Sequence, residues 1–143
     1  MHAARVEIRF SGTHAGFAQA FARLRGVLDA QELDAASRYS AELIFEEVVA
    51  NIVKHGAPDG RELDVHVTLE PRADSIVLTF DDDGVQFDPR GRPDPLPAKS
   101  LAEAKIGGFG LMLVRRAASA LDYRRTAEGR NQLTVMLRRA GAR

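Results

Sequence analysis

Five short segments of this chain alternate apolar and polar residues, and their spacing restricts the possible folds more than any other feature. Alternation with a period of two is typical of a strand that buries one face. These segments lie near residues 5–10, 63–69, 76–80, 121–126 and 132–138. Apolar residues recur at helical spacing over about 15–29, 34–56 and 107–120. This order predicts an α+β fold, a two-layer α/β sandwich in which about three helices cover one face of a mixed, mostly antiparallel sheet.

Size and composition indicate one domain with an ordinary surface. No composition shift marks a boundary within the 143 residues, so we expect a single domain over 1–143. Twenty basic residues balance twenty acidic ones, which argues against nucleic acid or a membrane as a direct partner. Because there is no cysteine, disulfides, thiolate catalysis and cysteine-based zinc sites are excluded. No apolar run reaches the ~20 residues of a membrane helix, and the first residues lack the apolar core of a signal peptide, so we expect a cytoplasmic protein.

The predicted helix over 34–56 carries three polar residues at successive steps of four, Glu47, Asn51 and His55. Such residues lie along one line of a helix surface, and here this line borders the apolar arc. An Asn oxygen can ligate a hard cation such as Mg²⁺, and a Glu can orient or deprotonate a hydroxyl group or a water. An ordinary polar helix edge with contacts between neighbouring turns explains the same spacing, and the spacing alone leaves both interpretations open.

An acidic sequence, Asp81-Asp82-Asp83-Gly84, ends the predicted strand near 76–80. If Phe80 faces the core, then Asp82 also faces it, while Asp81 and Asp83 point away. A core-facing carboxylate needs a partner, and the amino group of adenine is one candidate, because a carboxylate accepts its hydrogen. Gly84 would let the backbone approach the base closely. A solvated acidic turn or a metal-binding acidic cluster would also fit this sequence.

A glycine-rich sequence, Gly107-Gly108-Phe109-Gly110, precedes the last predicted helix. Glycines at a helix start expose backbone N–H groups, and the helix dipole favours phosphate oxygens there. These glycines could equally relieve crowding. The Gly-Lys-Ser/Thr of a Walker A loop does not occur in the chain. The segment before this helix, about 84–106, has no periodicity and holds four of the six prolines, which is typical of a functional or disordered loop.

The order and spacing of these motifs are more specific than any one of them. Glu47-x-x-x-Asn51, then Asp82-x-Gly84, a long loop, and Gly108-x-Gly110 resemble the GHKL ATPase superfamily, which includes DNA gyrase and sensor histidine kinases. Within it, the chain is most similar to the stand-alone anti-sigma-factor serine/threonine kinases. The similarity extends through residues 47–56, 82–89 and 107–114 and covers nearly the whole chain.

The resemblance implies the Bergerat fold, with ATP and Mg²⁺ as cofactors. It implies that Asn51 ligates Mg²⁺, that Glu47 is the catalytic general base, and that Asp82 binds the adenine amino group. Gly84 would line the base pocket.

For the other end of the nucleotide, the resemblance implies that Gly108 and Gly110 hold the phosphates, with residues 84–106 as a nucleotide lid. It also places Thr134 near adenine, although strand alternation puts Thr134 on the face opposite to Leu133. The chain departs from the family pattern at Gln86, which stands at the second glycine position of Asp-x-Gly-x-Gly.

The function implied by the resemblance is that of an anti-sigma factor with serine/threonine kinase activity. It would phosphorylate a small anti-sigma-factor antagonist and would also bind a sigma factor, and the protein could form a homodimer. A second hypothesis is a non-catalytic module that uses bound ATP to sequester a transcription regulator. A third is a scaffold without a nucleotide.

Overall fold

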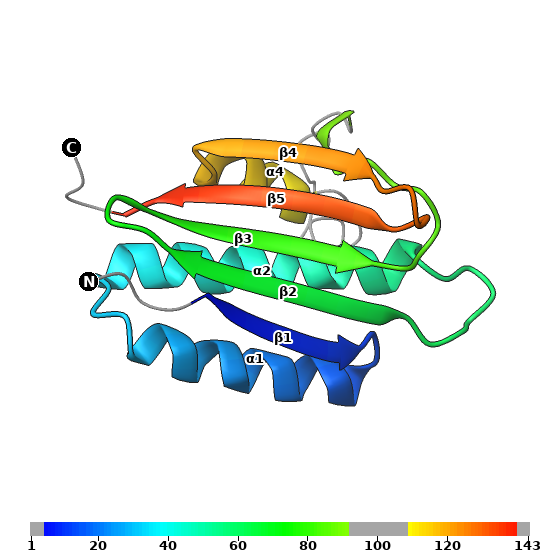
Figure 1. The fold of residues 1–143 in the computed structure, drawn as a ribbon, viewed down its shortest axis with the longest axis horizontal. Coiled ribbons are helices and arrows are strands. Elements are labelled where there is room, and N and C mark those ends of the chain that lie inside the picture. Colours follow the sequence, from blue (N-terminus) through cyan, green and yellow to red (C-terminus); the bar gives the residue numbers. More distant parts are fainter. Residues whose placement is uncertain (1–4, 92–108, 140–143) are drawn as a thin grey trace, which may run out of the picture.

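Five strands form one sheet with the order β1-β2-β3-β5-β4 (Figure 1). The computed structural model describes residues 5–91 and 109–139. The strands are β1 Val6–Ser11, β2 Asp64–Pro71, β3 Ser75–Asp82, β4 Ala120–Arg125 and β5 Asn131–Arg138. The helices are α1 His14–Asp29, α2 Ala35–His55, α4 Phe109–Ala117 and a short 3₁₀ helix, η1, Pro89–Gly91. No helix within the described ranges is long and apolar enough to span a membrane.

Every pair of neighbouring strands in this sheet is antiparallel. The α+β sandwich expected from the sequence is confirmed, but the sheet is not mixed within the described part of the chain. The chain passes from β3 through α4 to β4, a connection that normally leads to a parallel pair. Here β5 lies between β3 and β4 and pairs antiparallel with both of them, so no parallel pair forms.

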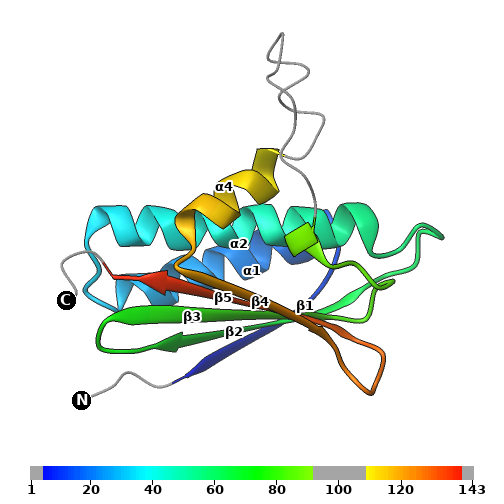
Figure 2. The same cartoon turned by 90° about the horizontal axis from the view of Figure 1, so that it is seen from above.

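The three α-helices of the described residues lie on one face of the sheet (Figure 2). Side chains of β2 and β5 alternate between buried and half-buried, because one face packs on helices and the other faces outward. Phe45 of α2 is fully buried at the centre of this layer. Its ring lies 5.9–6.2 Å from four aromatic rings, those of Phe10, Phe17, Phe21 and Phe80.

Capping residues fix both ends of α2, in agreement with the helix expected over 34–56. Asp34 is the N-cap and accepts the backbone N–H of Ser37 at 3.0 Å. Gly56 is the C-cap, and a Cβ there would lie only 2.6 Å from the carbonyl oxygen of Ile52. The backbone N–H of Val85 donates to the Gly56 carbonyl at 2.9 Å, so the end of α2 is attached to the segment that follows β3.

The expected lid over 84–106 falls only partly within the described residues. Residues 84–91 leave β3, run past the end of α2 and finish in η1. Residues 92–106 lie outside the described part, as do Gly107 and Gly108, so the lid and the phosphate role of Gly108 remain predictions.

Candidate functional site

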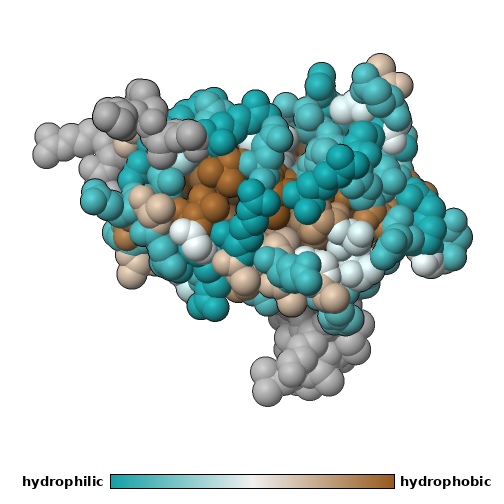
Figure 3. All heavy atoms as spheres, turned by 60° about the horizontal axis from the view of Figure 1, so that its bottom comes forward, coloured by the Kyte–Doolittle hydropathy of each residue, from teal (hydrophilic) through white to brown (hydrophobic). Residues whose placement is uncertain are grey.

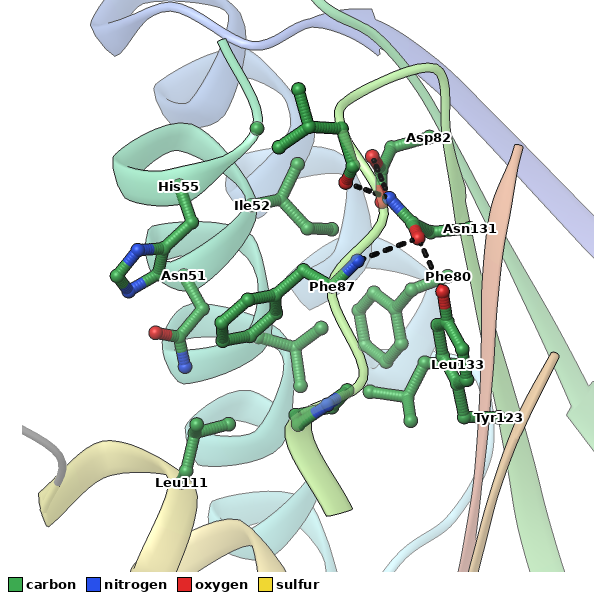
Figure 4. A pocket seen from close by; sticks show the side chains of 14 residues that line it. Asn51, Ile52, His55, Phe80, Asp82, Phe87, Leu111, Tyr123, Asn131 and Leu133 are labelled. Carbon is green, nitrogen blue, oxygen red and sulfur yellow. Dashed lines mark hydrogen bonds between the residues drawn. The ribbon is translucent and has the colours of Figure 1, made fainter. Parts of the chain in front are cut away.

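A pocket lies between α2, the ends of β3 and β5, and the segment 85–89 (Figure 4). Its empty volume is about 430 Å³, part of it open to solvent. Most of the lining is apolar. The polar side chains among the lining residues are Asn51, His55, Asp82, Tyr123 and Asn131. A largely apolar cleft with a few converging polar groups is the usual form of a small-molecule site.

Asp82 faces this pocket from the end of β3, as strand alternation predicts, and is only 4% exposed. Its Oδ1 accepts hydrogen bonds from the Gly84 backbone N–H at 2.9 Å and from Asn131 Nδ2 at 3.1 Å. Burial raises the pKa of Asp82, and these two hydrogen bonds partly oppose the rise. Both bonds go to the same oxygen, so Oδ2 is the oxygen left for a ligand.

Asp81 and Asp83 belong to the outward face, again as strand alternation predicts. Asp81 forms an ion pair with Arg130, and Asp83 forms one with Arg61 at 3.3 Å. Asp83 also accepts the Asp64 backbone N–H at 2.9 Å. No group of three or more acidic or His side chains suited to a metal occurs within the described residues, so the structure does not support the acidic metal cluster considered above.

Gly84 lies behind the pocket wall and is not itself among the lining residues. A Cβ there would lie 2.7 Å from Gly56 Cα and 2.8 Å from Asp82 Oδ1, so a side chain at this position would displace the pocket wall. The Arg125 side chain donates to the Gly84 carbonyl at 2.9 Å. Gln86, which departs from the family pattern, is exposed.

Asn51 and His55 line the α2 side of the pocket, on the line of residues predicted from the sequence (Figure 4). The Asn51 side chain is half-buried and makes no hydrogen bond within the described ranges, so its carboxamide is free for a ligand there. The His55 ring stacks on Phe87, with 4.7 Å between the centroids and 10° between the planes. His55 is therefore part of the pocket wall as well as a residue in the last turn of α2.

Glu47 lies one turn before Asn51, where α2 meets the beginning of α4. It does not line the pocket directly. Its carboxyl group lies against Gly110, and a Cβ added at Gly110 would be 3.0 Å from Glu47 Cδ. Partial burial raises the pKa of Glu47, and the neighbouring charge of Glu46 adds to the rise. Glycine at 110 thus gives the Glu47 carboxyl group its space.

Thr134 is not at the pocket, contrary to what the resemblance implies. In β5 it alternates with the buried Leu133 and Val135, and its Cα partners are Thr79 and Asp122 on the outward face. The physical reason is the period of two in a strand, which separates Thr134 from the helix-covered face. We therefore withdraw Thr134 as an adenine contact.

Asn131 is the polar residue that the sequence interpretation missed at this position. It begins β5, is 6% exposed and lines the pocket beside Asp82. The signal was available, because Asn131 has the same strand alternation as Leu133 and Val135 and is thus a polar residue on the core face.

The sandwich and its pocket define a class of protein, the small ATPase domains with a histidine-kinase-like fold. A model of the histidine kinase-like ATPase domain family matches residues 10–137. The chain therefore belongs to this family.

The chain is similar to a curated protein kinase and to a chain of a solved complex. Serine/threonine-protein kinase BtrW of Bordetella bronchiseptica is 36% identical over 98 residues, which is 68% of this chain and 68% of that protein. A chain in the crystal structure of the SiaB–SiaC complex from Pseudomonas aeruginosa superposes with a TM-score of 0.59 at 15% identity. That superposition covers 96% of this chain and 90% of the other, and it supports the fold alone.

Proposed function

We propose that the protein binds Mg²⁺·ATP in this pocket and transfers the γ-phosphoryl group to a serine or threonine of a small partner protein. The observation that carries the proposal is that Asn51 and Asp82, 31 positions apart in the chain, line one pocket. Kinship with a serine/threonine-protein kinase supports the reaction type.

The strand end of the pocket suits the adenine ring. The Asp82 carboxylate can accept a hydrogen from the exocyclic amino group of adenine. A guanine would present a carbonyl oxygen at this point, which a carboxylate cannot bind. Ile52, Phe80 and Leu133 provide apolar surface for the flat faces of the base.

The α2 side of the pocket suits a magnesium ion. The Asn51 carboxamide oxygen is a hard ligand, and its freedom from protein hydrogen bonds within the described ranges fits this role. A Mg²⁺ ion held by Asn51 would neutralise charge on the phosphates. The phosphates would then extend from Asn51 toward Gly110 at the beginning of α4, where helix N–H groups favour anions.

In this proposal Glu47 is the general base. In the transfer step, the hydroxyl oxygen of the acceptor attacks the γ-phosphorus, the bond between this phosphorus and the oxygen of ADP breaks, and Glu47 takes the hydroxyl proton. Its raised pKa suits a base, because proton transfer is most efficient when the pKa approaches the working pH.

The partner in this proposal is an anti-sigma-factor antagonist. Phosphorylation adds negative charge to the acceptor, which weakens its complex with the kinase, and the freed kinase then binds a sigma factor.

The edge of the molecule formed by β1 and α1 exposes apolar patches between charged side chains (Figure 3). Partly buried apolar residues there are Val6, Phe10, Phe17, Phe21 and Val27. This edge would be the interface of a homodimer, which the sedimentation mass of the protein can check.

The alternative, a non-catalytic module that uses bound ATP to sequester a regulator, has one observation in its favour. The Glu47 carboxyl group lies against Gly110 and not in the pocket lining. That alternative keeps Asn51 and Asp82 but makes Glu47 dispensable.

The Glu47→Gln variant separates these two functions. We expect phosphoryl transfer from radiolabelled ATP to the antagonist to fall about 100-fold or more, while ATP affinity changes little. The matched control is Glu62→Gln, the same change at an exposed position outside the pocket lining, which should transfer at the wild-type rate. Undiminished transfer by Glu47→Gln would remove Glu47 as the base. Absence of transfer by the wild type to every antagonist of the same organism would favour the binding module.

A further inference from the structure

Asn131 is the point at which β3, β4, β5 and the segment after β3 are joined. Its Nδ2 donates to Asp82 Oδ1 at 3.1 Å and to the Val85 carbonyl at 2.8 Å. Its Oδ1 accepts the Phe87 backbone N–H at 3.1 Å and the Tyr123 hydroxyl at 2.6 Å (Figure 4). Both donor hydrogens and both acceptor positions of the carboxamide are therefore in use.

These contacts fix which way the amide points. The Phe87 N–H can only donate, so the amide atom that faces it must be oxygen. The nitrogen is then directed to Asp82 and to the Val85 carbonyl. A carbonyl oxygen can only accept, and the Asp82 carboxyl group can only accept when it is ionised. The opposite orientation would place two donors against each other on one side and two acceptors on the other, which costs free energy in a buried site.

The orientation of Asn131 determines in turn what Asp82 offers to a ligand. The Asn131 amide and the Gly84 N–H together occupy Asp82 Oδ1. They leave Oδ2 as an acceptor facing a pocket that Asn131 also lines. Both donors favour the ionised carboxylate, the form that accepts hydrogen bonds only, and so oppose the rise in the pKa of Asp82 that burial causes.

Asn131 also holds the backbone on both sides of Gln86. Its bonds to Val85 and Phe87 fix the segment that carries the Phe87 ring against His55. One buried side chain therefore controls both the acceptor at the edge of the base and the position of an aromatic wall.

We propose that Asn131 is a positioning residue that sets base specificity by holding Asp82 with one carboxylate oxygen directed at the exocyclic amino group of adenine. This inference rests on the proposed binding of ATP. It assigns to Asn131 the discrimination between adenine and bases without an amino group at that position.

The test compares Asn131→Asp with Gln132→Glu. Both variants replace an amide by a carboxylate, but Gln132 is on the outward face, where it accepts from Arg124 at 2.7 Å. Dissociation constants are measured for ATP, for purine riboside triphosphate, which lacks the amino group, and for GTP. We expect Asn131→Asp to weaken ATP binding by about 10- to 100-fold and to remove the preference for ATP over purine riboside triphosphate. Gln132→Glu should keep the wild-type constants.

The pH dependence provides a readout that a merely structural role would not change. In Asn131→Asp, two carboxylates share the site, so one of them holds a proton to unusually high pH. The protonated form can donate to its neighbour as the amide does. ATP affinity of this variant should therefore recover as the pH is lowered from about 8 to about 6, while wild-type affinity does not increase.

Tyr123→Phe covers the case in which Asn131→Asp does not fold. It removes only the hydroxyl that donates to Asn131 Oδ1, and we expect a loss of ATP preference of about 2- to 10-fold. Wild-type ATP preference in a folded Asn131→Asp, or in Tyr123→Phe if the first variant does not fold, would overturn the role of Asn131 and leave the proposed function intact. A wild type that binds no ATP would overturn both.

Discussion

At the scale of single residues, the central feature is a carboxylate buried in an apolar pocket. Asp82 is 4% exposed, and burial raises its pKa above the ordinary value of 3.8. The folded protein therefore retains this proton at pH values where the unfolded chain has already lost it. As the pH rises from 3.8 through the raised pKa, this residue lowers the free energy of unfolding. Such a loss of stability is expected at a binding site where the buried charge binds a ligand.

Asp82→Asn should accordingly stabilise the ligand-free protein and impair its function. The Asn oxygen can keep the hydrogen bonds from Gly84 and Asn131, while its amide nitrogen replaces the free carboxylate oxygen. We expect a higher free energy of unfolding in urea at neutral pH, with the difference from wild type shrinking toward pH 4, and ATP binding weaker by about 10- to 100-fold. A variant less stable than wild type at neutral pH would contradict the claim that the buried charge of Asp82 lowers the free energy of unfolding.

How much of the site could be predicted from the sequence depends on how local each signal is. Strand alternation located Asp82 correctly, since only the parity of β3 matters. The same rule, applied to β5, favours Asn131 over Thr134 as a residue on the helix-covered face. The family resemblance instead pointed to Thr134, which lies on the other face. The hydrogen bonds of Asn131 to Asp82, Val85 and Phe87 could not be predicted, because they join residues 44 to 49 positions apart.

At the scale of elements, the end of α2 and the end of β3 meet through two glycines. Gly56 and Gly84 approach so closely that a Cβ on Gly84 would lie 2.7 Å from Gly56 Cα. The caps of α2 follow from local sequence, Asp34 before the helix and Gly56 after it. The contact between the two glycines does not, because it depends on the packing of α2 on the sheet. The insertion of β5 between β3 and β4 is likewise a property of the pairing and not of the strand sequences.

Two glycine-to-alanine changes test this view in opposite directions. Gly84→Ala should lower the free energy of unfolding by about 1–3 kcal/mol, because the new methyl group meets backbone that cannot move without displacing α2. Gly26→Ala, inside α1 with open space around it, should raise the free energy by about 0.5–1 kcal/mol through higher helix propensity. Urea unfolding curves give both values. Equal effects of the two changes would show that close packing at Gly84 is unimportant.

At the scale of the whole molecule, the site is assembled from segments far apart in the chain. The three α-helices of the described residues lie on one face of the sheet (Figure 2). The pocket lies where α2 passes the ends of β3 and β5. The residues that would contact the base and those near α4 lie on opposite sides of Asn51. One nucleotide extending along α2 would join them, with its base at Asp82 and its phosphates toward Gly110.

The most direct test of this account is the heat of nucleotide binding to the wild-type protein, measured by titration calorimetry. We expect saturable binding of one ATP per chain in the presence of Mg²⁺, weaker binding when EDTA removes the metal, and GTP binding at least about 10-fold weaker than ATP binding. No detectable ATP binding, or equal affinity for ATP and GTP, would contradict the claim that Asn51 and Asp82 form one adenine nucleotide site.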